Sequence, residues 1–208
     1  MTRPSEFTRE RILKAALSLF ADRGYEGASV RAIVAKAKVN QAAINYHFAG
    51  KEGLYRAVLH IAFEALTEDA RLDSETLKSL PREEALERFV RRQLRPLAGR
   101  DDLGRYLQIF NWEALRPTAV FAAFVTEEAA PFIAQAADLI RRFLPTANGR
   151  TIMVAAIWLL GQCSVFVRNR AQLSSLGLRS RGAADEDLID ELAFYVSRWA
   201  VSGLAHGA

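Results

Sequence analysis

Apolar residues recur at helical spacing along most of the chain, and the alternation typical of strands is nearly absent. The first helical stretch runs from Thr8 to Arg23, with one apolar stripe and Gly24 as its stop. Two short apolar segments follow, Ser29–Ala37 and Gln41–Phe48, separated by a brief break. The pattern predicts an all-α fold.

Longer helices are predicted for the rest of the chain. One begins near Lys51, repeats its apolar positions every three or four residues, and is expected to end near Leu72. Further helices are predicted at residues 81–98, 101–115, 118–144, 151–167 and 185–204. We expect Pro131 to kink or restart the helix that contains it, because proline has no N–H to donate.

The two short segments predict a helix-turn-helix, whose second helix lies in the DNA major groove. Ser29 and Asn40 stand where N-caps are expected. Ile44 and Phe48 are four residues apart and face one core. This leaves polar or small residues on the opposite face of the second helix, namely Gln41, Ala42, Asn45, Tyr46 and His47.

This region resembles the DNA-binding domain of the TetR family of transcriptional regulators. The resemblance rests on Thr8–Phe20, Val30–Ala37 and the run NYHFAGKEGLY from Asn45 to Tyr55. It implies an N-terminal three-helix DNA-binding domain (residues 1–50) and a C-terminal helical domain for ligand binding and dimerisation (residues 51–208). Lys38 departs from the family, which usually has a glycine in this turn; a lysine at positive φ costs roughly 1 kcal/mol.

The resemblance also assigns roles on the DNA. Gln41 is suited to a base edge, adenine best, and Ala42 is small enough to approach a thymine methyl. Phosphate contacts are expected from the starts of the flanking helices and from the tyrosine–histidine pair. Each residue taken alone could equally be an ordinary exposed side chain. The expected DNA contacts are Ser29, Arg31, Asn40, Gln41, Ala42, Asn45, Tyr46, His47 and Lys51.

The charge distribution agrees with a DNA-binding N-terminal region. Residues 1–60 hold ten Lys/Arg and five Asp/Glu, whereas residues 61–208 hold eighteen and nineteen. The whole basic excess of the chain, +4, therefore lies with the helix-turn-helix, as neutralisation of phosphates requires. Without the motif, a chance bias of solvated charges would explain it equally well.

A second stretch of interest is YLQIFNWEALRPT, Tyr106 to Thr118. The runs WEALRPTAVFAAFV and GQCSVFVRNR resemble the CecR-like subgroup of C-terminal ligand domains. Aromatic side chains with a few polar groups could line an apolar pocket for a small apolar or aromatic effector. An ordinary aromatic core is the alternative, with Glu113 at its wet rim, where it could pair with Arg116 across a turn. The candidate ligand residues are Phe110, Trp112, Glu113, Phe121, Phe124, Gln162 and Phe166.

The segment Thr151–Val167 contains no charged residue. Its length is near the lower limit for a membrane span, but Gly, Gln, Cys and Ser in its second half favour a buried or interfacial helix. The resemblance implies that the last two helices of each subunit pair across a two-fold axis, so we expect a homodimer and no membrane partner. Cys163 is the only cysteine, which excludes an internal disulfide. The polar N-terminus indicates a cytoplasmic location.

Enzyme chemistry finds little support. The three histidines are scattered, and no HExxH, GxSxG, Walker or GxGxxG pattern occurs. We expect no catalytic residues, metal or cofactor. The sequence predicts a ligand-responsive transcriptional regulator that binds an operator, most simply a repressor released by its effector. The alternatives are a helical enzyme that uses Asn111 and Glu113, and a sequence-neutral DNA binder.

Overall fold

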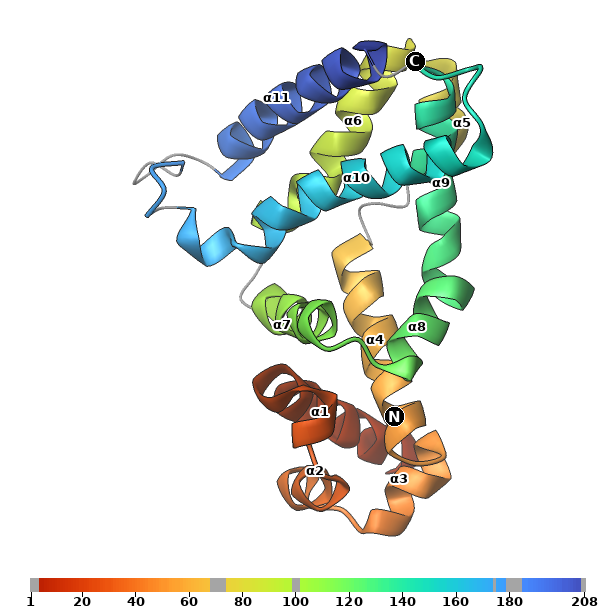
Figure 1. The fold of residues 1–208 in the computed structure, drawn as a ribbon. Helices are drawn as coiled ribbons and strands as arrows, with labels where there is room; N and C mark the ends of the chain where they lie inside the picture. The colour runs from red at the N-terminus through yellow and green to blue at the C-terminus, as the bar shows by residue number, and fades with distance from the viewer. Residues whose placement is uncertain (1–3, 68–73, 99–101, 174, 179–184, 207–208) are drawn as a thin grey trace. The chain divides into compact units, whose positions relative to one another are not determined.

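The computed structural model describes residues 4–67, 74–98, 102–173, 175–178 and 185–206. Every regular element among these residues is helical, which confirms the predicted all-α class. The chain forms two compact units (Figure 1). Unit 1 comprises residues 1–66 and 100–128, and unit 2 comprises residues 67–99 and 129–208. The predicted domain boundary at residue 50 stays a prediction.

Unit 1 is built around the helix-turn-helix. Helix α1 contacts α2, α3 and α7, so that one helix supports both the DNA-binding motif and a distant segment of the chain. The side chains of Ile12, Phe20 and Ile44 are fully buried in its core. Its helices are α1 (Pro4–Gly27), α2 (Val30–Ala37), α3 (Gln41–Phe48), α4 (Lys51–Thr67, but for its last residue), α7 (Asp102–Leu115) and α8 (Ala119–Phe124).

Unit 2 packs α11 along α6 and α10 on α9. Leu86, Phe89 and Ile189 are fully buried at its centre. A short helix at its start, α5, was not predicted from the sequence. Its elements are α5 (Ser74–Ser79), α6 (Arg82–Leu94), the 3-10 turn η2 (Arg95–Ala98), α9 (Ala130–Arg141), α10 (Gly149–Arg168), the 3-10 turn η4 (Arg170–Gln172) and α11 (Asp185–His206).

The helix breaks follow the local chemistry of the chain. Gly24 interrupts α1 with φ 67° and ψ 179°, after which one more helical turn follows. The helix predicted at residues 118–144 is divided by a π-helical turn, η3 (Val125–Ala129), which ends two residues before Pro131. Proline suits the first turn of a new helix, where its missing N–H has no partner to lose. The predicted restart at Pro131 is therefore confirmed.

Other boundaries lie close to their predictions. The helix from Lys51 ends at Thr67, and the last residues predicted for it, up to Leu72, fall outside the described part of the chain. Residues 81–98 form α6 followed by the tighter turn η2. Asn148 caps α10 by accepting a hydrogen bond from the backbone N–H of Thr151 at 2.9 Å.

Candidate nucleic-acid interface and effector site

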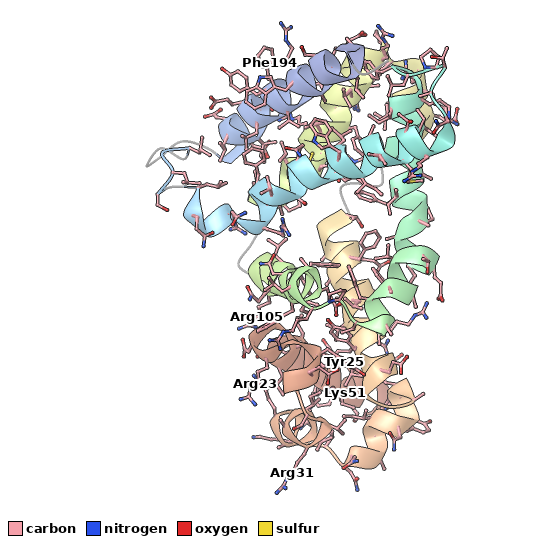
Figure 2. All side chains as sticks on the ribbon, in the orientation of Figure 1. Arg23, Tyr25, Arg31, Lys51, Arg105 and Phe194 are labelled. Carbon is pink, nitrogen blue, oxygen red and sulfur yellow. The ribbon has the colours of Figure 1, made fainter. Side chains whose placement is uncertain are left out.

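Helix α2 begins where the sequence predicts. The Ser29 hydroxyl oxygen accepts a hydrogen bond from the backbone N–H of Ala32 at 3.1 Å, which satisfies one of the unpaired donors of the first turn. Ile33 and Ala37 face the core. Arg31 is exposed at the start of the helix and extends from it into solvent (Figure 2).

Helix α3 presents a polar face because its apolar residues are anchored. Asn40 caps it, with Oδ1 accepting the N–H of Ala42 at 3.0 Å, and Ile44 and Phe48 are buried. The remaining face is therefore held outward; Tyr46 is 81% exposed. Exposed side chains on α3 are those of Gln41, Ala42, Asn45 and Tyr46.

The turn between these helices carries the strain predicted for it. Lys38 has φ 52° and ψ 50°, the left-handed conformation that glycine usually supplies. Its backbone N–H still bonds the carbonyl of Ala35. Arg11 stabilises the turn from α1 by donating from Nη2 to the carbonyls of Ala37 and Lys38, which would otherwise lack an intrahelical donor.

His47 and Lys51 have partners within unit 1 that the sequence did not reveal. The His47 ring is half-buried, with its centroid 4.9 Å from that of Tyr46. The Lys51 ammonium lies 4.3 Å from the centroid of the Tyr25 ring, a cation–π contact that fixes the start of α4 (Figure 2). Burial, aided by the charge of Glu52, raises the pKa of Tyr25.

Most of the aromatic candidates for an effector site form a row within unit 1. Ring centroids are 6.0 Å apart for Phe110 and Phe121, 6.3 Å for Phe121 and Phe124, and 5.5 Å for Phe124 and Phe63. Phe124 is fully buried, whereas the other three are half-buried. This row joins α4, α7 and α8.

Trp112 makes a contact that joins α7 to α1. Its indole Nε1 donates to the carbonyl of Ala21 at 2.9 Å. A Cβ atom on Gly24 would lie 3.1 Å from the indole ring. The ring therefore fills the space that the glycine leaves at the break in α1.

Glu113 is 2% exposed and accepts three hydrogen bonds. Oε1 accepts from the Tyr55 hydroxyl and, at 3.0 Å, from the Thr118 hydroxyl, while Oε2 accepts from the Thr118 N–H at 2.7 Å. Glu113 is therefore buried and not at a wet rim, and its hydrogen-bond partners are Tyr55 and Thr118 in place of Arg116, which is exposed. Burial and the bond to Glu113 strongly raise the pKa of Tyr55.

The two remaining ligand candidates lie in unit 2. Gln162 and Phe166 are half-buried on α10. Sequence reasoning missed a different feature of this unit, a cavity of about 760 Å³ along α6 and α11 that none of the predicted ligand residues lines. Its walls carry four arginines and four glutamates, Glu83, Glu84, Glu87, Arg88, Arg91, Arg92, Arg95 and Glu186. Arg91 is already paired there with Glu186 and Asp190.

A group of ion pairs on α4 was also missed. Arg56 contacts Glu127 and Glu128, and the Nδ1 atom of His60 lies 2.7 Å from a carboxylate oxygen of Glu128. These contacts fasten α4 to the π-helical turn η3. Their partners stand far apart in the sequence, so no local pattern indicates them.

Helix α10 leaves an apolar face uncovered. It is long and apolar enough to cross a membrane by length and composition, which is weak evidence because helices of soluble proteins pass the same test. Only 28% of its most apolar window is buried. Together with α11, it exposes large apolar side chains, namely Met153, Val154, Ile157, Trp158, Val165, Phe194, Tyr195 and Trp199.

Two family models match the chain. Residues 12–58 match the bacterial regulatory proteins of the tetR family. Residues 82–204, more than half of the chain, match the C-terminal domain of the HTH-type transcriptional dual regulator CecR. The chain belongs to the TetR family of transcriptional regulators. Both resemblances inferred from the sequence are thereby confirmed, and this is a family of regulators, not of enzymes.

Relatives of this TetR-family protein share parts of its length. It is 31% identical over 129 residues to the dual regulator CecR of Shigella flexneri, covering 58% of this chain and 57% of CecR. It is 41% identical over 69 residues to the transcriptional repressor NicS of Pseudomonas putida strain KT2440, covering 32% of each. The chain thus spans less than two thirds of either relative.

A solved structure shares the fold of this TetR-family protein. AibR, in complex with isovaleryl coenzyme A and operator DNA, aligns with a TM-score of 0.60 at 18% identity. The alignment covers 89% of this chain and 96% of AibR. At this identity the likeness establishes the fold alone: an N-terminal helix-turn-helix followed by a C-terminal helical region.

Proposed function

We propose that the protein is a homodimeric repressor that binds operator DNA and is released from it by a small apolar effector. The observation that carries the DNA-binding part is the face of α3. Buried Ile44 and Phe48 hold this helix so that its polar side chains are exposed. Family membership supplies the expectation that such a face reads DNA.

The proposed contacts divide into two kinds. Gln41 and Ala42, in the first turn of α3, read base edges, and Asn45 reaches a base or a phosphate. The other contacts position the protein on phosphates without reading sequence. Ser29 and Asn40 use a side-chain oxygen for capping, which leaves a hydroxyl and an amide N–H as donors. The proposed phosphate contacts are Ser29, Arg31, Asn40, Tyr46, His47 and Lys51.

Dimerisation is supported by the exposed apolar side chains of α10 and α11. Large apolar side chains exposed in such numbers are rare on a soluble monomer and are typical of an interface. We propose that a second copy of the chain covers these side chains, and that the dimer acts in the cytoplasm. Sedimentation should show a dimer at micromolar concentration, and Val165→Glu should give monomers or insoluble protein. A soluble wild-type monomer would refute the proposal.

The aromatic row of α4, α7 and α8 supports an apolar or aromatic effector. We place the effector contacts at Phe110, Phe121 and Phe124 of unit 1, while Gln162 and Phe166, which belong to unit 2, stay predictions from the sequence. Trp112 and Glu113 support the site indirectly, because each is held by contacts within unit 1. The effector acts by binding more tightly to the conformation that does not fit the operator, and only this difference in affinity shifts the population.

The function is tested by mapping the DNA that the protein occupies in its own genome and measuring affinity for the recovered sequence. We expect affinity for this operator to exceed that for a random duplex by about 10³-fold or more. A reporter gene behind the operator should be less active with the protein present. Increased expression instead would indicate activation, a direction that the relationship to a dual regulator leaves open. Equal affinity for both duplexes would identify the sequence-neutral binder.

A further inference from the structure

A cavity of about 440 Å³ lies where the end of α2 meets α1. Four basic residues line it, Arg11, Lys14, Lys36 and Lys38, and the rest of its wall is alanine. None of the lining residues described for this cavity is acidic. We refer to these four side chains and the space between them as the basic niche.

Two of the four basic side chains already donate hydrogen bonds within the protein. Arg11 caps the carbonyls at the end of α2, and the Lys36 ammonium donates to the Ser18 hydroxyl at 2.6 Å. Lys14 and Lys38 are exposed, and their charges add to those of the other two. Like charges gathered around one cavity repel, and a bound anion would reverse that cost.

Lys38 is the unexpected member of the niche. It occupies a left-handed turn position, φ 52°, where glycine or asparagine would be less strained. Strained residues gather at functional sites, where the side chain contributes something that the relaxed residue could not. The lysine adds a positive charge to the niche that glycine cannot supply.

The niche is next to the proposed recognition helix. Lys38 stands two residues before Asn40, the N-cap of α3, so their Cα atoms are at most about 7 Å apart. The N-terminus of a recognition helix lies at the base edges of the major groove, whose walls are lined by phosphates. An anion entering the niche is therefore most simply a phosphate of the DNA strand beside that groove.

We propose that the basic niche binds a backbone phosphate of the operator, with Lys38 and Lys14 as contacts additional to those of α3. The proposal rests on the proposed binding of operator DNA. Lys38 then strengthens the binding of DNA, although its strained backbone lowers the stability of the fold. Because a phosphate contact carries no sequence information, the niche should strengthen binding to every duplex equally.

The test compares the full-length protein with Lys38→Gly, Lys14→Gln and Arg105→Gln. Arg105 is an exposed arginine on α7, well away from Arg31 in Figure 2, and controls for the general loss of one positive charge. Fluorescence anisotropy gives the affinity for the operator and for a random duplex at salt concentrations from about 50 to about 300 mM. Over this range each lost phosphate contact changes the dependence of affinity on salt measurably. Thermal melts give Tm.

Lys38→Gly should raise Tm by a few degrees, because glycine relieves the turn, and yet weaken binding to both duplexes several-fold. The slope of log K against log salt should fall by about 0.9 for each phosphate that the variant no longer neutralises, and so by about twice that in a dimer. Lys14→Gln should change affinity in the same direction without raising Tm. Arg105→Gln should leave the slope nearly unchanged.

Each contrary result has a distinct meaning. If the wild type binds DNA and Lys38→Gly matches its affinity and slope, the niche is not a phosphate site. If Arg105→Gln loses as much affinity as Lys38→Gly, the effect is one of net charge, which also overturns the assignment. A wild-type protein that binds neither duplex would overturn the proposed function itself.

Discussion

Replacing Gly24 by alanine should destabilise unit 1 through two separate effects. The φ 67°, ψ 179° conformation is available almost only to glycine, and forcing another residue into it costs about 1–3 kcal/mol. The new Cβ would also lie 3.1–3.4 Å from three atoms of the Trp112 indole, inside the distance of optimal contact between carbon atoms. Moving the ring would stretch its hydrogen bond to Ala21, worth about 1 kcal/mol.

The combined cost is about 2–4 kcal/mol, which for a chain of this length lowers Tm by roughly 5–15 °C. Trp112 is the one tryptophan of unit 1, because the other two of the chain, Trp158 and Trp199, belong to unit 2. Its fluorescence, recorded after Trp158→Phe and Trp199→Phe, therefore follows the unfolding of unit 1 selectively.

Two comparisons complete the experiment. Gly104→Ala changes a glycine of α7 that has no neighbour within 4 Å of a new Cβ, so it should raise stability by about 0.5–1 kcal/mol. In a Trp112→Phe background, followed by far-UV circular dichroism because the tryptophan probe is gone, Gly24→Ala should cost about 1 kcal/mol less than in the wild type, since no indole hydrogen bond to Ala21 remains to be lost. A Gly24→Ala protein that melts within about 2 °C of wild type would refute the reasoning.

Further predictions concern the buried carboxylate, the DNA face and the cysteine. Glu113→Gln should reduce the free energy of unfolding by about 1–3 kcal/mol in thermal melts, since an amide cannot accept all three hydrogen bonds; unchanged stability with a lost effector response would make Glu113 a ligand contact instead. Gln41→Ala should cost roughly 1–3 kcal/mol at one base pair, whereas Tyr46→Ala should weaken binding to all sequences; an unchanged sequence preference would remove Gln41 as a base reader. Burial raises the pKa of the Cys163 thiol to about 12, so the reactive thiolate is scarce between pH 7 and 9, and an aromatic disulfide reagent should label it quickly only in urea.

The sequence predicted those features whose partners are neighbours in the chain. Ser29 caps a donor three residues on, and Asn40 caps one two residues on, so both helix starts could be located from residue type and spacing. The apolar pair Ile44 and Phe48 likewise determined which face of α3 is exposed. The turn strain at Lys38 followed from the family resemblance, because the family usually has a glycine at this position.

Long-range partners were beyond such reasoning. Glu113 bonds Tyr55, 58 residues away, and a hydrogen bond of that kind has no periodic signature. The nearer residue Arg116 offered a plausible local pair, and the burial of Glu113 decided against it. One signal was available in the sequence: Tyr55 and Glu113 each interrupt an apolar helix face. Buried polar groups of this kind require hydrogen-bond partners.

The composition of unit 1 affects how this regulator could be recombined with others. Its first 66 residues are completed by residues 100–128, which belong to the span matched by the CecR C-terminal domain. A hybrid that joins residues 1–66 to another protein's effector region would leave Ala21 and Gly24 without the indole of Trp112. The helix-turn-helix is thus not a self-sufficient cassette, and exchange of DNA specificity should succeed more often by grafting the exposed face of α3 than by exchanging the whole N-terminal segment.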